Sequence, residues 1–316
     1  MMIAIAAAFV SFIIVFAGVP VLRRIALRIG FVDRPSPRKI HRKPVPLMGG
    51  AAIYAAVAVT FILYQGITGL SLTVAVGGLA LVAIGLTDDA FKAKGRDFPV
   101  WPRVVGYLAV SMLPLSFGIR IMAVTDPVSG KFYLFPEWLS AVATIVWVFA
   151  LINMVNFIDG ADGLASGVSM ISSATLLVAA IIKKQPDTAL LAAIIIGACI
   201  GFLAYNFHPA RIFLGDAGAT FLGFVLAVVA VEGAFKSATL LSMAVPILAL
   251  GLPIFDTIIV MLRRLLLGKP LHRADNMHFH HVLMRWGLNQ VQAVSFLYLI
   301  AALFALLSIV LLLVQK

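Results

Sequence analysis

Residues 138–163 read WLSAVATIVWVFALINMVNFIDGADG. The first part of this stretch, 138–156, carries no charged side chain. At about 1.5 Å per residue, a helix of that length crosses the hydrocarbon core of a bilayer. The last part places Asp159 and Asp162 among glycines directly after the apolar run. The stretch therefore predicts a membrane-spanning helix that ends in a polar segment at the membrane surface.

The whole chain has the composition of a membrane protein. Of its 316 residues, 62% are hydrophobic and 12% are charged, and the mean hydropathy is +1.09. Soluble domains are about 45–50% apolar and about 25% charged, so this composition excludes a soluble globular protein. We predict an all-α polytopic membrane protein that forms one domain over residues 1–316. Ten spans are expected, near 2–22, 47–65, 70–87, 103–120, 138–156, 164–182, 188–206, 217–235, 239–262 and 293–315.

Basic residues predict the orientation, because short loops rich in Lys and Arg stay in the cytoplasm. Of the 24 Lys and Arg residues, 18 fall in the odd-numbered connections between spans or, for Arg103, directly beside one. Both termini are therefore expected outside, and the net charge of +11 is explained without a nucleic acid partner. Nine of the 13 acidic residues share the basic face, which a topology rule does not require. The face is expected to bind a cation and an anionic substrate, and it comprises connections 23–46, 88–102, 157–163, 207–216 and 263–292.

Two adjacent carboxylates, Asp88 and Asp89, follow the third predicted span. Like charges side by side repel, so both stay ionised only with solvent, a cation or basic partners nearby. An isolated pair of this kind is most simply a solvated helix end. The other acidic segments on the same face favour a functional pair instead.

A second polar set follows the fifth span, where Asn153, Asn156 and Asp159 are spaced three apart. If the helix continues, these residues share one face and Asp162 extends the series. Asp162 could alternatively cap the next helix. Asp216 opens the eighth span, where a capping role is equally ordinary. One or two carboxylates are typical ligands of Mg²⁺. Zinc is less expected, because no Cys or His residues at the spacing of zinc ligands accompany these carboxylates.

The last cytoplasmic loop carries His278, His280 and His281. Such a cluster could bind a metal, respond to pH or donate hydrogen bonds to phosphate oxygens, and its acidic neighbours favour phosphate. The first loop is rich in cations, which include Arg38 and Lys43. These could guide an anionic substrate or bind lipid head groups.

Asp256 lies inside the ninth predicted span, where an acidic residue is functional by default. That span also contains Pro246, Gly251 and Pro253. Asp256 could therefore instead satisfy freed backbone groups or pair with a basic neighbour. The sequence leaves these roles equally open.

In chain order, Asp88-Asp89, the segment 156–163 (NFIDGADG), the segment 213–216 (FLGD) and the segment 278–281 (HFHH) form one set. This set resembles the polyprenyl-phosphate N-acetylhexosamine-1-phosphate transferases of glycosyltransferase family 4. The resemblance covers nearly the whole chain. The segment 33–41 (DRPSPRKIH) makes the chain more similar to the WecA/TagO-like branch than to the related MraY branch.

The resemblance implies transfer of a sugar 1-phosphate, with N-acetylglucosamine as the first choice of sugar, from a UDP-sugar to undecaprenyl phosphate. UMP is released and Mg²⁺ is required, with Mn²⁺ as a substitute. The reaction would be the first membrane step of a teichoic acid or O-antigen type of envelope polymer, at the cytoplasmic face of a bacterial plasma membrane. By this resemblance Asp216 and Asp89 hold the metal, Asp88, Asp89, Asp159 and His278 are catalytic, and Asn156, Asp162, Arg38, Lys43, His280 and His281 bind substrate.

Three alternatives stay open at this stage. The chain could act on the muramoyl-pentapeptide donor of peptidoglycan synthesis, it could be a membrane transporter, or it could be a non-catalytic scaffold. A transporter would place ionisable residues near the bilayer midplane, whereas most acids here lie at span ends. The sequence identifies neither the sugar nor whether the protein is a homodimer.

Overall fold

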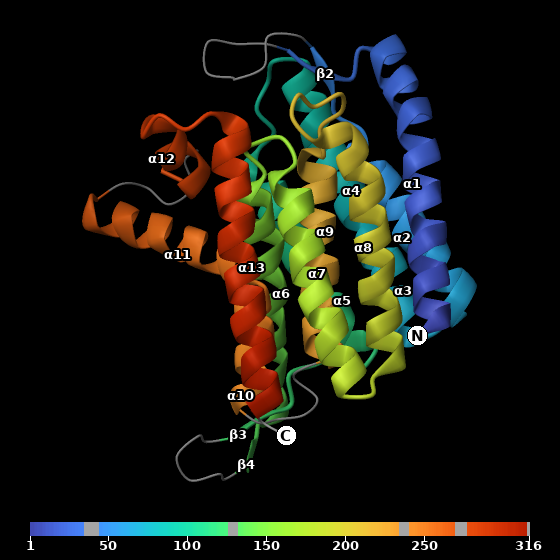
Figure 1. Ribbon diagram of the computed structural model, residues 1–316, viewed down its shortest axis with the longest axis vertical. Helices are drawn as coiled ribbons and strands as arrows, with labels where there is room; N and C mark the ends of the chain where they lie inside the picture. The colour runs from blue at the N-terminus through green and yellow to red at the C-terminus, as the bar shows by residue number, and fades with distance from the viewer. Residues whose placement is uncertain (35–43, 126–131, 234–239, 269–276, 315–316) are drawn as a thin grey trace.

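We analysed a computed structural model, which describes residues 1–34, 44–125, 132–233, 240–268 and 277–314. Helices make up most of the described chain (Figure 1), as the apolar runs predict. The helices are α1 (Met2–Ile29), α2 (Gly49–Gln65), α3 (Gly69–Leu72), α4 (Gly78–Ala93), α5 (Val100–Ser116), α6 (Glu137–Ile158), α7 (Leu164–Ile182), α8 (Pro186–Asn206), α9 (Gly215–Gly233), α10 (Leu240–Ala249), α11 (Gly251–Leu266), α12 (Phe279–Arg285) and α13 (Gln290–Val314). A π-helical segment, η1 (Thr73–Gly77), joins α3 to α4.

Seven helical segments in the described part of the chain are long and apolar enough to cross a membrane. This finding confirms a polytopic helical membrane protein, while ten spans stay a prediction. α2 is also apolar but shorter. The seven are α1, the continuous segment Gly69–Ala93, α6, α7, α8, α9 and α13.

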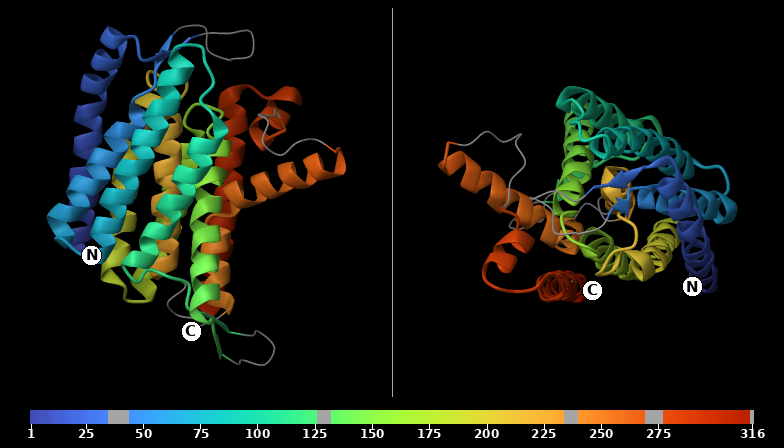
Figure 2. Two further views of the ribbon diagram at one scale, coloured as in Figure 1. Left: turned by 180° about the vertical axis from the view of Figure 1, so that it is seen from behind. Right: turned by 90° about the horizontal axis from the view of Figure 1, so that it is seen from above.

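Helix α9 runs through the middle of the bundle, where α2, α4, α6 and α7 pack around it (Figure 2). Almost every side chain of α9 is buried. Glycines let its neighbours approach closely, because a Cβ on Gly218 would meet the backbone of Gly50 in α2. The start of α9, which bears Asp216, is thereby held at a fixed place at one end of the bundle.

Both chain termini lie at one end of the bundle, and the loops that carry the predicted site lie at the other (Figure 1). A two-stranded antiparallel ribbon stands at each end. At the site end, β1 (Val32–Asp33) pairs with β2 (Val45–Pro46), and at the terminal end β3 (Ala123–Thr125) pairs with β4 (Phe132–Leu134). The structure thus separates the termini from the site, while the side of the membrane on which each end lies stays a prediction.

The predicted ninth span, 239–262, is two helices rather than one. α10 ends at Ala249, and α11 begins at Gly251 and projects sideways from the bundle (Figure 2). The break is possible because Gly251 has no side chain where the ring of Phe304 approaches, and Pro253 lies in the first turn of α11. The projection carries Asp256 beneath α12 instead of leaving it inside a straight span.

Candidate active site

A cavity of about 890 Å³ opens at the site end of the bundle. Its wall is built from α1, α4, α8, α9, α12 and α13, from the strands β1 and β2, and from loops that include the segment after α6. Segments that are far apart in the chain therefore contribute polar side chains to one space. These side chains include Asp89, Lys92, Asp159, Asp162, Asp216 and His281.

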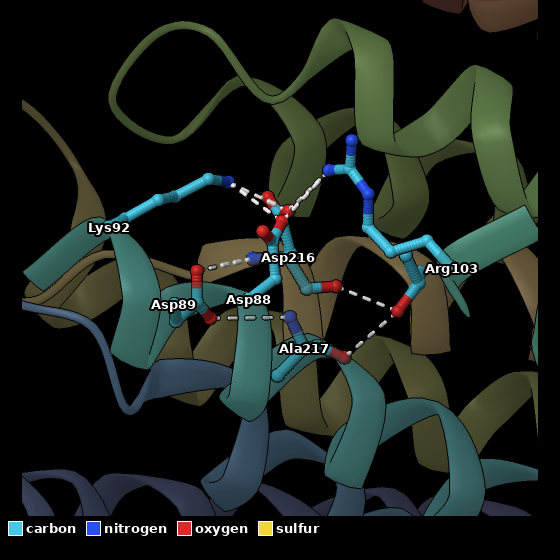
Figure 3. Close-up of polar contacts among 7 residues, drawn as sticks. Asp88, Asp89, Lys92, Arg103, Asp216 and Ala217 are labelled. Carbon is cyan, nitrogen blue, oxygen red and sulfur yellow. Dashed lines mark hydrogen bonds and ion pairs between the residues drawn. The ribbon is translucent and has the colours of Figure 1, made fainter. Parts of the chain in front are cut away.

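An ion cluster lies at the junction of α4, α5 and α9 (Figure 3). Nζ of Lys92 is 2.7 Å from Oδ2 of Asp216 and 3.3 Å from Oδ2 of Asp88. Nη1 of Arg103 donates to Oδ2 of Asp88 at 2.9 Å and lies 3.8 Å from Oδ2 of Asp216. Two cations thus bridge two carboxylates, and they offset the repulsion that burial would otherwise make costly. Asp88 is fully buried behind the cavity, whereas Lys92 and Asp216 line it.

Asp89 points in a different direction and caps the start of α9 (Figure 3). Its Oδ1 accepts a hydrogen bond from the backbone N–H of Asp216 at 3.2 Å, and its Oδ2 accepts from that of Ala217 at 3.5 Å. The first amides of a helix lack partners within the helix and favour a negative charge. Gly215, with φ of 71°, leaves room for this carboxylate. Asp89 therefore fixes the position of the neighbouring Asp216.

Asp159 follows the last residue of α6 and lines the cavity. Burial, together with the negative charge of Asp216, raises the pKa of Asp159 to about 8. Asn156, one turn earlier on α6, lies near the Asp216 carboxylate. The helix ends before Asp159, so the predicted stripe is only partly formed: Asn153 donates instead to the carbonyl of Phe149 in its own helix.

The segment 159–163 is clamped by three neighbouring helices. The N–H of Gly163 donates to Oδ1 of Asn206 in α8 at 3.0 Å, and the hydroxyl of Tyr298 in α13 donates to the carbonyl of Gly163 at 2.6 Å. The ring of His280 in α12 packs where a side chain on Gly160 would lie. This clamp holds Asp159 in the cavity wall.

Asp162 organises the loop that follows α8. Its Oδ2 lies 2.8 Å from Nδ1 of His208 and accepts the N–H of Ala210 at 3.0 Å. The peptide bond between His208 and Pro209 is cis. The predicted capping of α7 by Asp162 is not seen, because Gly163 occupies the cap position without a side-chain bond.

The rings of the three predicted histidines contact one another beside the cavity: His278 stacks on His280, and His281 is tilted against His280. Ring centroids are 6.1 Å apart for His278 and His280, and 4.1 Å apart for His280 and His281. His281 lines the cavity, whereas His280 is buried against Gly160, and burial lowers the pKa of His280 to about 3. This position favours packing over phosphate contact for His280. Nδ1 of His278 is bonded to Asp256 at 2.6 Å.

The predicted residues thus fall into three groups. Asp89, Asp159, Asp162, Asp216 and His281 line the cavity, and Asp88, Asn156, His278 and His280 stand directly behind or beside it. The two predicted substrate guides, Arg38 and Lys43, lie outside the described residues.

Sequence reasoning missed three residues that build the site. Lys92 and Arg103 entered it only as topology signals, although the spacing of four between Asp88 and Lys92 is the spacing at which helical side chains pair. Asn206 gave no signal. Its amide joins Gly163 to the carbonyl of Ile212, and only the folded chain brings those segments together.

No preformed metal centre is evident in the described part of the chain. No group of three or more His, Cys, Asp or Glu side chains there is arranged to hold a metal ion. The carboxylates of Asp88 and Asp216 instead share the ammonium group of Lys92. Binding of a cation by these residues therefore requires further oxygen ligands.

The chain matches a known protein family and several named relatives. A family model described as glycosyl transferase family 4 matches residues 71–234. A probable undecaprenyl-phosphate N-acetylglucosaminyl 1-phosphate transferase of Bacillus subtilis is 38% identical over 305 residues, which cover 96% of this chain and 83% of the relative. An undecaprenyl-phosphate alpha-N-acetylglucosaminyl 1-phosphate transferase of Escherichia coli K12 is 31% identical, over 90% of this chain and 77% of the relative.

A third relative comes from a mycobacterium. A decaprenyl-phosphate N-acetylglucosaminephosphotransferase of Mycolicibacterium smegmatis is 30% identical over 88% of this chain and 74% of its own length. The matched family segment, 71–234, contains the ion cluster, the segment 159–163 and the start of α9. On this evidence, the chain belongs to glycosyl transferase family 4.

Proposed function

We propose that this protein transfers N-acetylglucosamine 1-phosphate from a UDP-sugar to undecaprenyl phosphate and releases UMP. The observation that carries the proposal is one cavity lined by Asp89 and Lys92 of α4, by Asp159 after α6 and by Asp216 at the start of α9. The names of the relatives support the acceptor lipid and the sugar. We propose that the reaction starts an envelope polymer of the teichoic acid or O-antigen type.

We propose that the cavity faces the cytoplasm of a bacterial plasma membrane, across which the chain passes ten times. A lipid phosphate stays at the bilayer surface while a nucleotide sugar arrives from the cytosol, so the site must lie at one end of the bundle. The positive-inside rule assigns that end to the cytoplasm, because most Lys and Arg residues belong to its connections.

We propose Mg²⁺ as the metal, with Mn²⁺ as a substitute. The residues fit such an ion: Asp216 and Asp89 offer hard oxygen atoms in the cavity wall. Mg²⁺ in phosphate sites commonly uses only one or two carboxylates, together with substrate phosphates and water. Such a coordination does not require a group of three metal-binding side chains, and no such group is found among the described residues. When bound, the ion would neutralise charge on the diphosphate.

The side chains of the cavity would align two phosphates and neutralise their charge, which is most of what phosphoryl transfer needs. Lys92 is both in the cavity wall and in contact with Asp216, so it can exchange that carboxylate for a phosphate oxygen. Asp159, with its raised pKa, carries a proton near neutral pH and can donate a hydrogen bond to a phosphate oxygen. His281, which also lines the cavity, would contact the phosphates as well.

We favour direct attack by the acceptor phosphate. A phosphate monoester has a second pKa of about 6, so the lipid phosphate is mostly a dianion at pH 7 and needs no general base. Its oxygen forms a bond to the sugar-bearing phosphorus of the donor, and the bond from that phosphorus to the bridging oxygen breaks. UMP leaves with the electron pair. A phosphorylated aspartate trapped in a single turnover would overturn this route.

The proposed function is tested with purified protein in detergent, Mg²⁺, labelled UDP-N-acetylglucosamine and undecaprenyl phosphate. We expect undecaprenyl diphosphate-linked N-acetylglucosamine and UMP to form in equal amounts. Neither product should form with Asp216→Asn. A panel of UDP-sugars, which includes the muramoyl-pentapeptide donor, identifies the sugar. Absence of product with every donor, together with solute flux through protein-containing liposomes, would instead support a transporter.

A further inference from the structure

Both carboxylate oxygens of Asp256 form hydrogen bonds with the segment 278–279, at the start of α12. Oδ2 lies 2.6 Å from Nδ1 of His278, and Oδ1 accepts the backbone N–H of Phe279 at 2.7 Å. Both side chains are almost wholly buried, with 3% of Asp256 and 12% of His278 exposed. Phe279 is the first residue of α12, so Asp256 caps this helix and binds the preceding histidine at the same time.

We propose that Asp256 is a positioning residue, which holds the His278 ring as its Nδ1–H tautomer and leaves the lone pair of Nε2 to accept a hydrogen bond from an O–H or N–H group of the substrate. The inference rests on the proposed function only in the last step, the contact with substrate. The tautomer follows from the hydrogen bond alone, because an ionised carboxylate only accepts, so the proton must lie on Nδ1.

Two further contacts hold the ring in place. The His278 ring stacks on that of His280 with an angle of 8° between their planes, and Phe157 lies on it at 6.1 Å between centroids. Among the described residues, no hydrogen-bond partner lies at Nε2 of His278. One ring nitrogen is thus fixed, the ring plane is fixed, and the other nitrogen is left open.

The stack also links His278 to the cavity, since His280 contacts the ring of His281, which lines the cavity wall. The same carboxylate that orients His278 therefore also places the start of the helix that carries His280 and His281. This arrangement gives a reason for an acidic residue in α11: the break at Leu250 and the projection of α11 bring Asp256 to α12. A carboxylate that orients a histidine is a recurrent device in enzymes, because the second ring nitrogen must face the reacting group in the correct protonation state.

The decisive variant is Asp256→Asn. The amide oxygen can still accept the N–H of Phe279, so the cap is kept, whereas the amide nitrogen donates to Nδ1 of His278 and favours the Nε2–H tautomer. We expect the melting temperature in detergent to change little. We expect kcat to fall at least about tenfold with little change in KM for the UDP-sugar, similar to the loss when other histidine-orienting carboxylates are removed. Asp187→Asn, at the exposed start of α8, is the matched control and should leave kcat unchanged.

Two readouts distinguish positioning from a general structural role. The ¹⁵N spectrum of histidine-labelled protein, assigned with His278→Gln, should show His278 as Nδ1–H in the unmodified chain and as Nε2–H in Asp256→Asn. In a His278→Gln background, Asp256→Asn should lower kcat less than about twofold, because the residue through which Asp256 acts is gone.

The proposal is overturned if His278 keeps its tautomer in Asp256→Asn. It is also overturned if the loss of kcat in the double variant equals the product of the losses in the two single variants. The spectrum needs no substrate, so the tautomer can be established even when no transfer activity is found. A failure of the proposed function is therefore distinct from a failure of this inference.

Discussion

Nζ of Lys92 lies 2.7 Å from Oδ2 of Asp216, which joins the end of α4 to the start of α9. The same nitrogen lies 3.3 Å from Oδ2 of Asp88. One flexible cation therefore separates two carboxylates that would otherwise repel, and it does so in the wall of the cavity. A substrate phosphate would offer Lys92 an alternative anionic partner.

Lys92→Gln should lower kcat/KM for transfer at least about tenfold, because the donor phosphates lose a cation and the two carboxylates lose their bridge. Lys92→Arg keeps the charge and should retain more activity than Lys92→Gln. Lys94→Gln, two residues on at the exposed end of α4, is the control and should behave as the parent protein. UMP release measures all three, and equal rates for the Lys92 and Lys94 glutamine variants would contradict the assigned role.

Gly215→Ala should disturb the site more than its backbone strain alone predicts. Gly215 and Gly118 both have left-handed backbones, with φ of 71° and 73°, so alanine at either position costs about 1 kcal/mol in strain. A Cβ on Gly215 would also lie 2.5 Å from Oδ2 of Asp89, whereas nothing lies near Gly118. We expect similar melting temperatures for both variants but a large loss of transfer only in Gly215→Ala. Equal activity would show that Asp89 need not hold its position.

The spans could be predicted from the sequence, because an uncharged apolar run in the bilayer must form a helix to satisfy its backbone hydrogen bonds. The break at Leu250 could not. Pro246, Gly251 and Pro253 are tolerated in continuous membrane helices, and the contact that makes the break possible, between Gly251 and Phe304, joins two distant helices.

The end of the bundle that carries the site was also predictable from charge. The hydrogen-bond and ion-pair partners of each acidic side chain there were not. Asp88 and Asp89 are adjacent on α4, so their side chains point about 100° apart on the helix. One meets Arg103 and the other the amides of α9, and only the packing of three helices decides which. The sequence left Asp256 open for the same reason, since its partners His278 and Phe279 follow a separate loop.

The buried ring of His280 should make the fold sensitive to mild acid. Burial lowers its pKa to about 3, against about 6.5 in an unfolded chain. Between these values the unfolded chain binds the proton and the folded chain does not, so stability is complete above pH 6.5 and falls as the pH falls. The loss is about 1.4 kcal/mol per pH unit below 6.5. Thermal unfolding from pH 7.5 to 5 should show this slope, and His280→Asn should flatten it; an unchanged slope in the variant would refute the assignment.

Tyr298→Phe should loosen the segment 159–163, because the hydroxyl that donates to the carbonyl of Gly163 is lost. Removal of one such bond costs about 1 kcal/mol of stability. Tyr54→Phe is a matched control, since that half-buried hydroxyl also donates to a backbone carbonyl, of Ala75, and makes no bond to the segment 159–163. We expect comparable melting temperatures and a lower kcat only for Tyr298→Phe. A similar kcat for both variants would mean that this bond does not position Asp159.

Metal binding should depend on the donor substrate. No set of three metal-binding side chains is assembled in the part of the chain that the structure describes, and Lys92 already neutralises Asp216. EDTA should therefore abolish transfer without lowering the melting temperature of the substrate-free protein. Electron paramagnetic resonance should detect tightly bound Mn²⁺ only after UDP-N-acetylglucosamine is added, because the diphosphate supplies the missing oxygens. Asp216→Asn should lose this signal while Asp187→Asn keeps it. Tight Mn²⁺ binding without nucleotide would show instead that the carboxylates form a complete site on their own, with Lys92 displaced.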